Sequence, residues 1–398
     1  MQARVVVSRR ARSDVVVVGG GVVGAACALA LAGLDLDVTL VEAAEPARWS
    51  PAHPDLRVFA FAPDNAALLD GFDAWRGVLE ARVQPYRRMR VWDAAGGGEL
   101  AFDADAVGRR ELGWIVENGL LVDRLWAALA RAGVEVRMPA RVEGLEQDAA
   151  GVRLRLDDGS RVEARVAIAA DGAGSTLRKL AGGEVSRHDY GQRGVVAFIE
   201  TGRPHEETAW QRFLPTGPLA VLPFAEGRSS IVWTLPDARA DEVLALDDDG
   251  FARELTRAFD ARLGAMRAVS KRAAFPLRRQ LVQSQVHGRV LVVGDAAHVV
   301  HPLAGQGVNL GLRDVAALRD AVAAARSRNA DWTTPHRLAR WARARASENA
   351  VAAHAYDGIN RLFSSDGMHR TLLRGPLLGL AGRLPGVTHA LWRRAAGV

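Results

Sequence analysis

The feature that most constrains the fold is a glycine-rich turn between two apolar runs near the N-terminus. The sequence predicts a strand over residues 14–18, a Gly-Gly-Gly-Val-Val-Gly turn over residues 19–24, a helix of small residues that continues to about residue 32, and a second strand over residues 37–41. A short apolar run, a tight turn and a helix in this order are typical of a β-α-β unit. A chain that begins in this way is expected to build a parallel sheet.

The glycine spacing within this unit points to a ligand. Gly19 makes the turn, Gly21 lets the backbone approach a pyrophosphate, and Gly24 lets the helix pack closely on the strand. Glu42 follows the second strand, where a carboxylate can bind a ribose hydroxyl. The pattern predicts a dinucleotide site, and it does not distinguish FAD from NAD.

A second motif follows the apolar run over residues 290–293, which is predicted to be a strand buried on both faces. It continues through a turn-rich connection into a predicted helix from about residue 308, whose free N–H groups favour negative charge. An ordinary strand-loop-helix connection would also explain this segment alone. The residues that we assign to a ligand site here are Gly294, Asp295, Gly305, Gln306, Gly307, Val308 and Asn309.

A third strand end repeats the arrangement of a carboxylate and a glycine. The predicted strand over residues 166–170 ends in Asp171 and Gly172, and Ser175 and Arg178 lie on the helix entry that follows. We expect this motif to form another edge of the same ligand site. Arg57 is a further ligand candidate, although a surface salt bridge would explain a lone arginine equally well.

The length of 398 residues allows two domains with separate cores. We expect the nucleotide-binding domain to be discontinuous over 14–70, 118–182 and 278–335, and a substrate-binding domain to comprise 71–117 and 183–277. In that second domain, a helix over about 241–263 is expected to cover a sheet. Shorter strands are expected over 142–147, 152–156 and 161–166. Residues 1–13 are expected to be a disordered leader, and 336–398 a helical C-terminal region.

Composition excludes several classes of protein. The net charge is +6, but arginine supplies nearly all of the positive charge and no basic patch is interleaved with aromatic residues, so we expect no nucleic-acid partner. The single cysteine, Cys27, excludes an internal disulfide and a thiolate metal cluster, and it fits a reducing cytoplasm. We expect no metal site. The glycines of residues 19–24 argue against reading the N-terminal apolar run as a signal peptide or a membrane span.

Residues 367–398 contain five arginines, many leucines and no acidic residue. An apolar face bordered only by arginine could lie on an anionic membrane surface. A helix packed on the body of the protein with a solvated face explains the pattern equally well.

Together the three motifs resemble those of the flavoprotein aromatic hydroxylases that are built like para-hydroxybenzoate hydroxylase. The resemblance implies an α/β fold with a Rossmann-like FAD-binding domain, a mixed β-sheet substrate domain and C-terminal helices. It implies that the first motif holds the ADP half of FAD, that the Asp171 motif serves both FAD and NAD(P)H, and that the Asp295 motif binds the ribityl and pyrophosphate part. The wording GDAAHVVHPLAGQGVNLGLRDV and the pair Glu117-Asn118 are similar to the ubiquinone-biosynthesis branch. Gly174 departs from that pattern, where asparagine is common.

The resemblance also implies a reaction. FAD would be reduced by NADH or NADPH, add O₂ at its C4a atom as a hydroperoxide, and transfer one oxygen to a polyprenylated phenol or quinol of ubiquinone synthesis. NAD(P)H is expected to visit transiently, because no second glycine fingerprint occurs. Pro302 would shape the wall beside the reactive edge, and His298 and His301 are either catalytic or structural members of the loop. An insoluble prenyl tail implies peripheral contact with the inner face of the membrane or a biosynthetic complex.

Two other functions remain open at this point. A reductase or dehydrogenase of the same fold would carry the same three motifs and would turn over without O₂. A non-catalytic subunit that bears FAD within a ubiquinone-synthesis complex would bind the cofactor, but its flavin would stay oxidised in the presence of NAD(P)H.

Overall fold

The computed structural model describes residues 12–94, 98–300, 307–363, 393 and 397, with the backbone alone described over 352–363. Four candidate site residues, His301, Pro302, Gly305 and Gln306, lie outside the described residues. So do the expected leader up to residue 11 and nearly all of residues 367–398.

The first sheet contains the predicted β-α-β unit at its centre. Five of its strands run parallel, so their carboxyl ends meet at one edge. Its main path, in spatial order, is β18 (Val286–His287), β19 (Val290–Val292), β11 (Arg161–Ala169), β1 (Ser13–Val18), β2 (Val38–Val41) and β8 (Glu135–Arg137).

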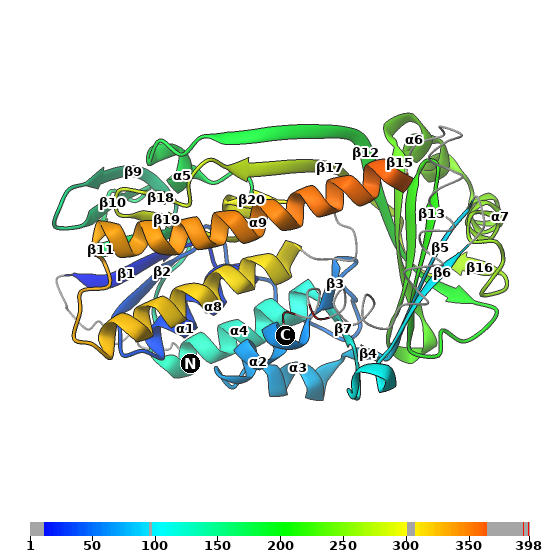
Figure 1. Cartoon of the computed structure of the whole chain (residues 1–398), viewed down its shortest axis with the longest axis horizontal. Helices are drawn as coiled ribbons and strands as arrows, with labels where there is room; N and C mark the ends of the chain where they lie inside the picture. The colour runs from blue at the N-terminus through cyan, green and yellow to red at the C-terminus, as the bar shows by residue number, and fades with distance from the viewer. Residues whose placement is uncertain (1–11, 95–97, 301–306, 364–392, 394–396, 398) are drawn as a thin grey trace.

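Alternation along the strands gives this sheet a core on each face. Val15 and Val17 of β1 belong to one buried cluster, and Val16 and Val18 belong to another. Helices pack along one face of this sheet, and α9 lies above them (Figure 1). These elements are α1 (Val22–Ala32), α4 (Asn118–Ala132), α8 (Gly307–Arg326) and α9 (Pro335–Phe363).

The opposite face of the first sheet is covered by an antiparallel hairpin and the short helix α5 (Thr176–Leu180). The hairpin strands are β9 (Val142–Gln147) and β10 (Val152–Leu156), and β10 pairs with the first half of β11. The expectation of separate strands over 161–166 and 166–170 was wrong. The two runs form the single strand β11, because its first half pairs with β10 while its second half pairs with β1.

The second sheet is mixed and stands at the other end of the molecule (Figure 1). Its strands, in spatial order, are β20 (His298–Val299), β17 (Ala273–Val282), β12 (Val185–Thr201), β15 (Ser229–Pro236), β14 (Gly217–Pro223), β13 (Thr208–Leu214), β5 (Arg88–Asp93) and β6 (Glu99–Asp103), with β16 (Met266–Ala268) paired to β12. The long strands β12 and β17 extend from this sheet back toward α5 and the first sheet (Figure 1).

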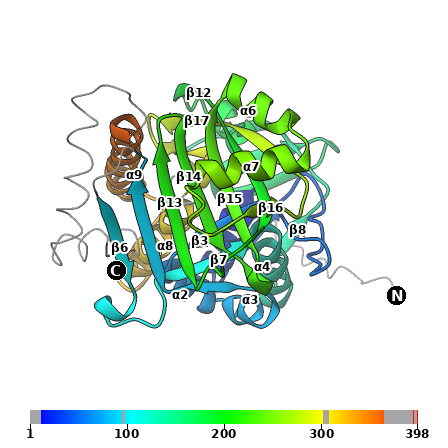
Figure 2. The same cartoon turned by 90° about the vertical axis from the view of Figure 1, so that its right-hand side faces the viewer.

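Two helices cover the outer face of the second sheet, as Figure 2 shows. They are α6 (Asp237–Ala245) and α7 (Asp248–Ala258). The expectation of one helix over about 241–263 was therefore wrong. The chain breaks at Leu246, which has an extended backbone, and the Asp247 carboxylate then caps α7 by accepting a hydrogen bond from the Gly250 N–H at 2.7 Å.

A small third sheet connects the two larger ones. It contains β3 (Val58–Phe61), β7 (Gly113–Glu117) and β4 (Gln84–Tyr86), and the neighbouring helices are α2 (Pro63–Asp70) and α3 (Trp75–Ala81). The side chains of β3 face two ways. Phe59 belongs to the core of the first sheet, whereas Ala60 packs with apolar residues of the second sheet.

The observed architecture is the expected α/β class, with a parallel nucleotide-binding sheet and a second mixed sheet. The expected domain bounds stay a prediction. The strand β17 runs through the expected boundary between residues 277 and 278, so the chain crosses between the two units within a strand and not in a loop.

Candidate cofactor site

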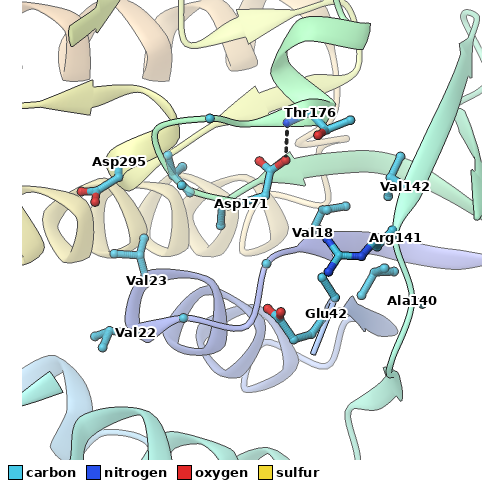
Figure 3. Close-up of a pocket in the computed structure, with 18 of the residues that line it drawn as sticks. Val18, Val22, Val23, Glu42, Ala140, Arg141, Val142, Asp171, Thr176 and Asp295 are labelled. Atoms are coloured by element: carbon cyan, nitrogen blue, oxygen red, sulfur yellow. Dashed lines mark hydrogen bonds between the residues drawn. The ribbon is translucent and has the colours of Figure 1, made fainter. Parts of the chain in front are cut away.

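A cavity of about 660 Å³ lies at the carboxyl edge of the first sheet (Figure 3). This edge is where open α/β sheets bind their ligands. All three sequence motifs contribute to its wall. The predicted site residues that line it are Gly19, Gly21, Glu42, Arg57, Asp171, Gly172, Asp295 and Val308.

The glycine turn is shaped by close backbone contacts on one side and by open space on the other. Gly19 has a φ of +104°, and a Cβ there would overlap the Ala170 carbonyl. A Cβ at Gly24 would overlap the Gly19 carbonyl oxygen, so this glycine serves helix packing, as expected. Gly21 has nothing within 4 Å of its Cβ direction and lines the cavity. A ligand can therefore approach the backbone at Gly21.

The start of α1 is prepared for an anion. Gly21 is its N-cap, no side chain caps it, and its first turn carries no acidic residue. The first N–H groups of the helix and its positive dipole end therefore favour a phosphate group at this point. The group that such a site fits best is the pyrophosphate of a dinucleotide.

Glu42 stands at the end of β2, on the wall of the same cavity (Figure 3). Its carboxylate accepts hydrogen bonds from the Gly20 N–H and, at 3.2 Å, from the Ala44 N–H. The indole of Trp126 donates to the Gly20 carbonyl at 2.7 Å. These contacts hold the carboxylate against the glycine turn, which is the position expected for a ribose-binding group.

Asp171 organises the second strand end. Its Oδ2 atom accepts hydrogen bonds from the backbone N–H groups of Thr176 at 2.7 Å (Figure 3) and of Leu177 at 3.1 Å, and Ser175 Oγ donates to its Oδ1 atom. Asp171 therefore caps α5 while its loop lines the cavity. Gly172 has a φ of +80°, which suits glycine in this tight loop.

Ser175 and Arg178 lie behind the cavity wall and are almost fully buried. Arg178 donates from Nη1 to the Ala296 carbonyl at 2.6 Å and from Nη2 to the Ala173 carbonyl at 3.2 Å. It thereby ties the Asp171 loop to the turn that follows β19. In this structure the two residues position the site; a direct contact with a cofactor stays a prediction.

Asp295 projects into the cavity from the short helical turn η3 (Gly294–Ala296). Its Oδ2 atom lies 3.8 Å from Nη2 of Arg57, and about half of each side chain is exposed. A pair held this loosely and in contact with the cavity can exchange partners for a ligand at little cost. The structure thus brings Arg57, which the sequence alone could not assign, to the expected site.

Behind this turn lies a buried polar cluster centred on Asp314 of α8. Its carboxylate accepts hydrogen bonds from four groups that belong to three other segments of the chain. These are the Gly294 N–H at 3.1 Å, His298 Nε2 at 2.6 Å, Arg345 Nε at 2.8 Å and Asn349 Nδ2 at 3.1 Å. The carboxylate therefore fixes the turn that carries Asp295 to both C-terminal helices.

The charges around Asp314 decide its ionisation. Burial by itself raises the pKa of a carboxyl group, but His298 and Arg345 outweigh burial here and hold the pKa of Asp314 well below its usual range. Burial, aided by the Asp314 carboxylate, raises the pKa of the Cys27 thiol to about 12. Cys27 is therefore a neutral part of the core.

His298 was a catalytic candidate, and the geometry favours its structural alternative. The residue is buried, does not line the cavity, and has its Nε2 atom engaged by Asp314. Its Nδ1 atom has no hydrogen-bond partner in the described part of the chain. A catalytic role for His298 stays an untested prediction.

Gly307 and Asn309 lie at the start of α8, as expected, but they are not in the cavity wall. Asn309 is fully buried, and it donates from Nδ2 to the Ala60 carbonyl at 2.8 Å while its Oδ1 atom accepts from the Ala62 N–H at 3.0 Å. It joins the helix start to β3. Gly294, with a φ of +59°, is packed against Val23.

The sequence motifs did not predict the residues of one wall of the cavity. The residues there, which follow β8, are Ala140, Arg141, Val142 and Glu143. The first three lie near Glu42 in Figure 3. No local motif marks them. Their position could have been inferred from the expected strand before them, because the carboxyl ends of parallel strands share one edge.

A cavity suited to a dinucleotide at the carboxyl edge of a parallel sheet, in a chain that also builds a second mixed sheet, fits the class of flavoprotein monooxygenases. The family model described as FAD binding domain matches residues 12–347. The ubiquinone hydroxylase UbiL of Rhodospirillum rubrum is 37% identical over 387 residues, which cover 97% of this chain and 90% of the relative. The 3-demethoxyubiquinol 3-hydroxylase of Escherichia coli is 35% identical, and the alignment covers 89% of this chain and 90% of that protein.

Solved structures show the same fold. p-Nitrophenol 4-monooxygenase of Pseudomonas putida superposes with a TM-score of 0.77 at 20% identity, covering 97% of this chain and 98% of that one. PqsL of Pseudomonas aeruginosa gives a TM-score of 0.75 at 23% identity, covering 90% and 98%. The chain belongs to the family of FAD-dependent monooxygenases that contains the ubiquinone-biosynthesis hydroxylases.

Among the described residues, no group of histidine, cysteine and acidic side chains could hold a metal ion. No described helix has the length and apolar character needed to cross a membrane.

The Asp314 cluster predicts a specific response to Asp314→Asn. The variant should lose about 3 kcal/mol of unfolding free energy at pH 7, because the buried guanidinium of Arg345 then keeps only Asn349 and the exposed carboxylate of Glu348 as partners. Since the pKa of Asp314 is depressed in the folded state, its contribution to stability is present above the unfolded pKa of about 3.9 and is lost as pH falls toward the folded value.

Chemical denaturation between pH 7 and pH 3 measures this response. The difference between wild type and Asp314→Asn should shrink as the pH falls below about 4. Asp320→Asn, which removes an exposed carboxylate on the same helix from its pair with Arg319, should change stability little at any of these pH values. A difference that stays constant with pH would contradict the assignment.

Proposed function

We propose that the protein hydroxylates the ring of a polyprenylated phenol or quinol intermediate of ubiquinone synthesis, with NAD(P)H as electron donor and O₂ as oxygen source. The observation that carries the proposal is the single cavity formed by all three motifs in a chain whose relatives are named ubiquinone hydroxylases. The cavity has the size and the helix-start amides that a dinucleotide cofactor requires.

The residues of the cavity divide the work of holding FAD. The start of α1 would bind the pyrophosphate, Glu42 the ribose of the adenosine half, and Asp295 the ribityl side. Arg57 faces the cavity beside Asp295 and supplies a positive charge for the phosphates. Bound FAD, once reduced, would supply the chemistry that activates O₂ and inserts one oxygen atom into an electron-rich ring.

The N-terminus of α8 supplies the electrostatic part of the mechanism. Val308 lines the cavity in the first turn of this 20-residue helix, so the positive end of the helix dipole lies at the cavity wall. Negative charge that develops on a group beside this turn is stabilised by the free N–H groups. Asn309 and Asp314 hold the helix start in place through the contacts described above.

The reaction class is tested by measuring NAD(P)H oxidation, O₂ consumption and product with a short-chain prenylated phenol. One hydroxylated product should form for each O₂ consumed, and omission of O₂ should abolish turnover beyond one reduction of the flavin. Sustained anaerobic turnover would instead identify a reductase. A flavin that NAD(P)H fails to reduce would identify a non-catalytic FAD-bearing subunit.

We also propose that the protein binds the inner face of the membrane peripherally or works within a biosynthetic complex. Either arrangement would give it access to a substrate whose prenyl tail is insoluble in water. The supporting observation is the set of five arginines and no acidic residue within 367–398. The full chain should sediment with vesicles that contain an anionic lipid and not with neutral vesicles, and 0.5 M salt should release it. Replacing Arg370, Arg374, Arg383, Arg393 and Arg394 by glutamine should abolish sedimentation; unchanged binding would contradict this surface.

A further inference from the structure

The second sheet has an inner face, defined here as the face toward the first sheet. Phe198, Ala209, Ala220 and Leu222 of this face share a buried cluster with Ala60 of β3 and Ile115 of β7. The outer face instead packs on α6 and α7 (Figure 2). Because side chains alternate along a strand, Gln211 of β13 lies on the same face as Ala209.

The pairing of the strands confirms this placement. Gln211 is directly opposite Ala220 in the antiparallel pair of β13 and β14, and residues opposite one another share a face. The same row continues to Val91 on one side and to Val232 on the other. Gln211 is therefore the polar member of an otherwise apolar row.

The side chain of Gln211 is nearly buried, with 7% of the residue exposed. None of the described hydrogen bonds involves its amide group, and its neighbours in the row cannot supply one. Gln280, a comparably buried glutamine of β17, differs in this respect. It accepts from Arg187 Nε at 3.0 Å and donates to the Ala173 carbonyl at 3.0 Å.

Neither Oε1 nor Nε2 of Gln211 is among the fully enclosed, unpaired polar atoms of the described residues, so a ligand beside this face can reach the amide. An amide without a described protein partner in an otherwise apolar row is suited to a ligand that supplies the hydrogen bond. Ala209 and Ala220 lie beside Gln211, and their small side chains occupy little volume there. The face therefore combines an apolar surface for a ring with one group that can orient it.

The position of this row relative to the cofactor cavity supports a ring-binding role for the inner face. The strand β3 separates them: Phe59 lines the cavity, and Ala60 packs with the inner face of the second sheet. Ala60 is also the residue whose carbonyl accepts the hydrogen bond from Asn309 at the start of α8. A ring on the inner face thus lies one strand away from the cofactor wall.

We propose that Gln211 is a specificity-determining residue that hydrogen-bonds the ring oxygen of the phenol or quinol substrate. This inference rests on the proposed function, and it names the protein group that recognises the hydroxyl. The amide can accept a hydrogen bond from a phenol through Oε1 or donate one to a ring oxygen through Nε2. An ether in place of the hydroxyl cannot donate to Oε1.

The test compares two probes, 2-prenylphenol and its O-methyl ether, with the FAD-loaded full chain. Binding is read from the change in flavin absorbance. Wild type should bind the phenol about tenfold more tightly than the ether, which corresponds to one hydrogen bond. In Gln211→Leu the two dissociation constants should become about equal. A merely structural role would weaken both probes alike and leave their ratio unchanged.

Gln192→Leu is the matched control, since Gln192 lies on β12 of the same sheet and donates to the Thr216 carbonyl at 3.2 Å. The Gln192→Leu variant should still bind the phenol about tenfold more tightly than the ether. The unfolding temperature of cofactor-free Gln211→Leu should equal or exceed that of wild type, because no hydrogen bond is lost; a clear decrease would overturn the proposal.

The remaining outcomes separate this proposal from the proposed function. A wild type that binds both probes equally, or a Gln211→Leu variant that keeps the preference, overturns the role of Gln211 and leaves hydroxylation standing. A wild type whose flavin responds to no phenol and that forms no hydroxylated product overturns both.

Discussion

The cofactor site depends on one buried carboxylate. Asp314 joins the turn after β19 to α8 and α9 through four hydrogen bonds, and without it the Gly294 N–H, His298 Nε2 and Arg345 Nε would each lose their acceptor. A charge as deeply buried as this is tolerated only where it is paired and fully hydrogen-bonded. The arrangement places Asp295 in the cavity while the helices remain packed behind it.

The other strand ends are also held in place by buried hydrogen bonds. Arg178 ties the Asp171 loop to the β19 turn through Ala296, and Asn309 ties α8 to β3. Each of these residues acts behind the wall of the cavity, so the wall is held by side chains that do not themselves face it. Preorganisation of this kind lets a site bind a cofactor without reordering its own groups.

The residues at the cofactor-binding edge of the first sheet could be predicted from the sequence, because parallel strands bring their carboxyl ends together. Gly19, Gly21, Glu42 and Asp171 could be placed on one cavity by that rule alone. The roles of Ser175, Arg178 and Asn309 could not, because a polar residue near a motif faces the ligand or the scaffold depending on helix phase and tertiary contacts. The segment after β8 has no motif, and Gln211 becomes conspicuous only when strand pairing shows that its row is apolar. The break between α6 and α7 was missed because Leu246 fits a continuous helical pattern, and the cap at Asp247 decides the outcome.

The central claim is that the edge formed by β1, β2, β11 and β19 is an FAD site. The most direct measurement is FAD titration of cofactor-free wild type and Asp295→Ala, followed by the quenching of flavin fluorescence, with circular dichroism to check the fold. Wild type should bind one FAD per chain, and Asp295→Ala should retain the fold while its affinity for FAD falls at least tenfold. Full retention of the yellow cofactor by the variant would contradict the assignment.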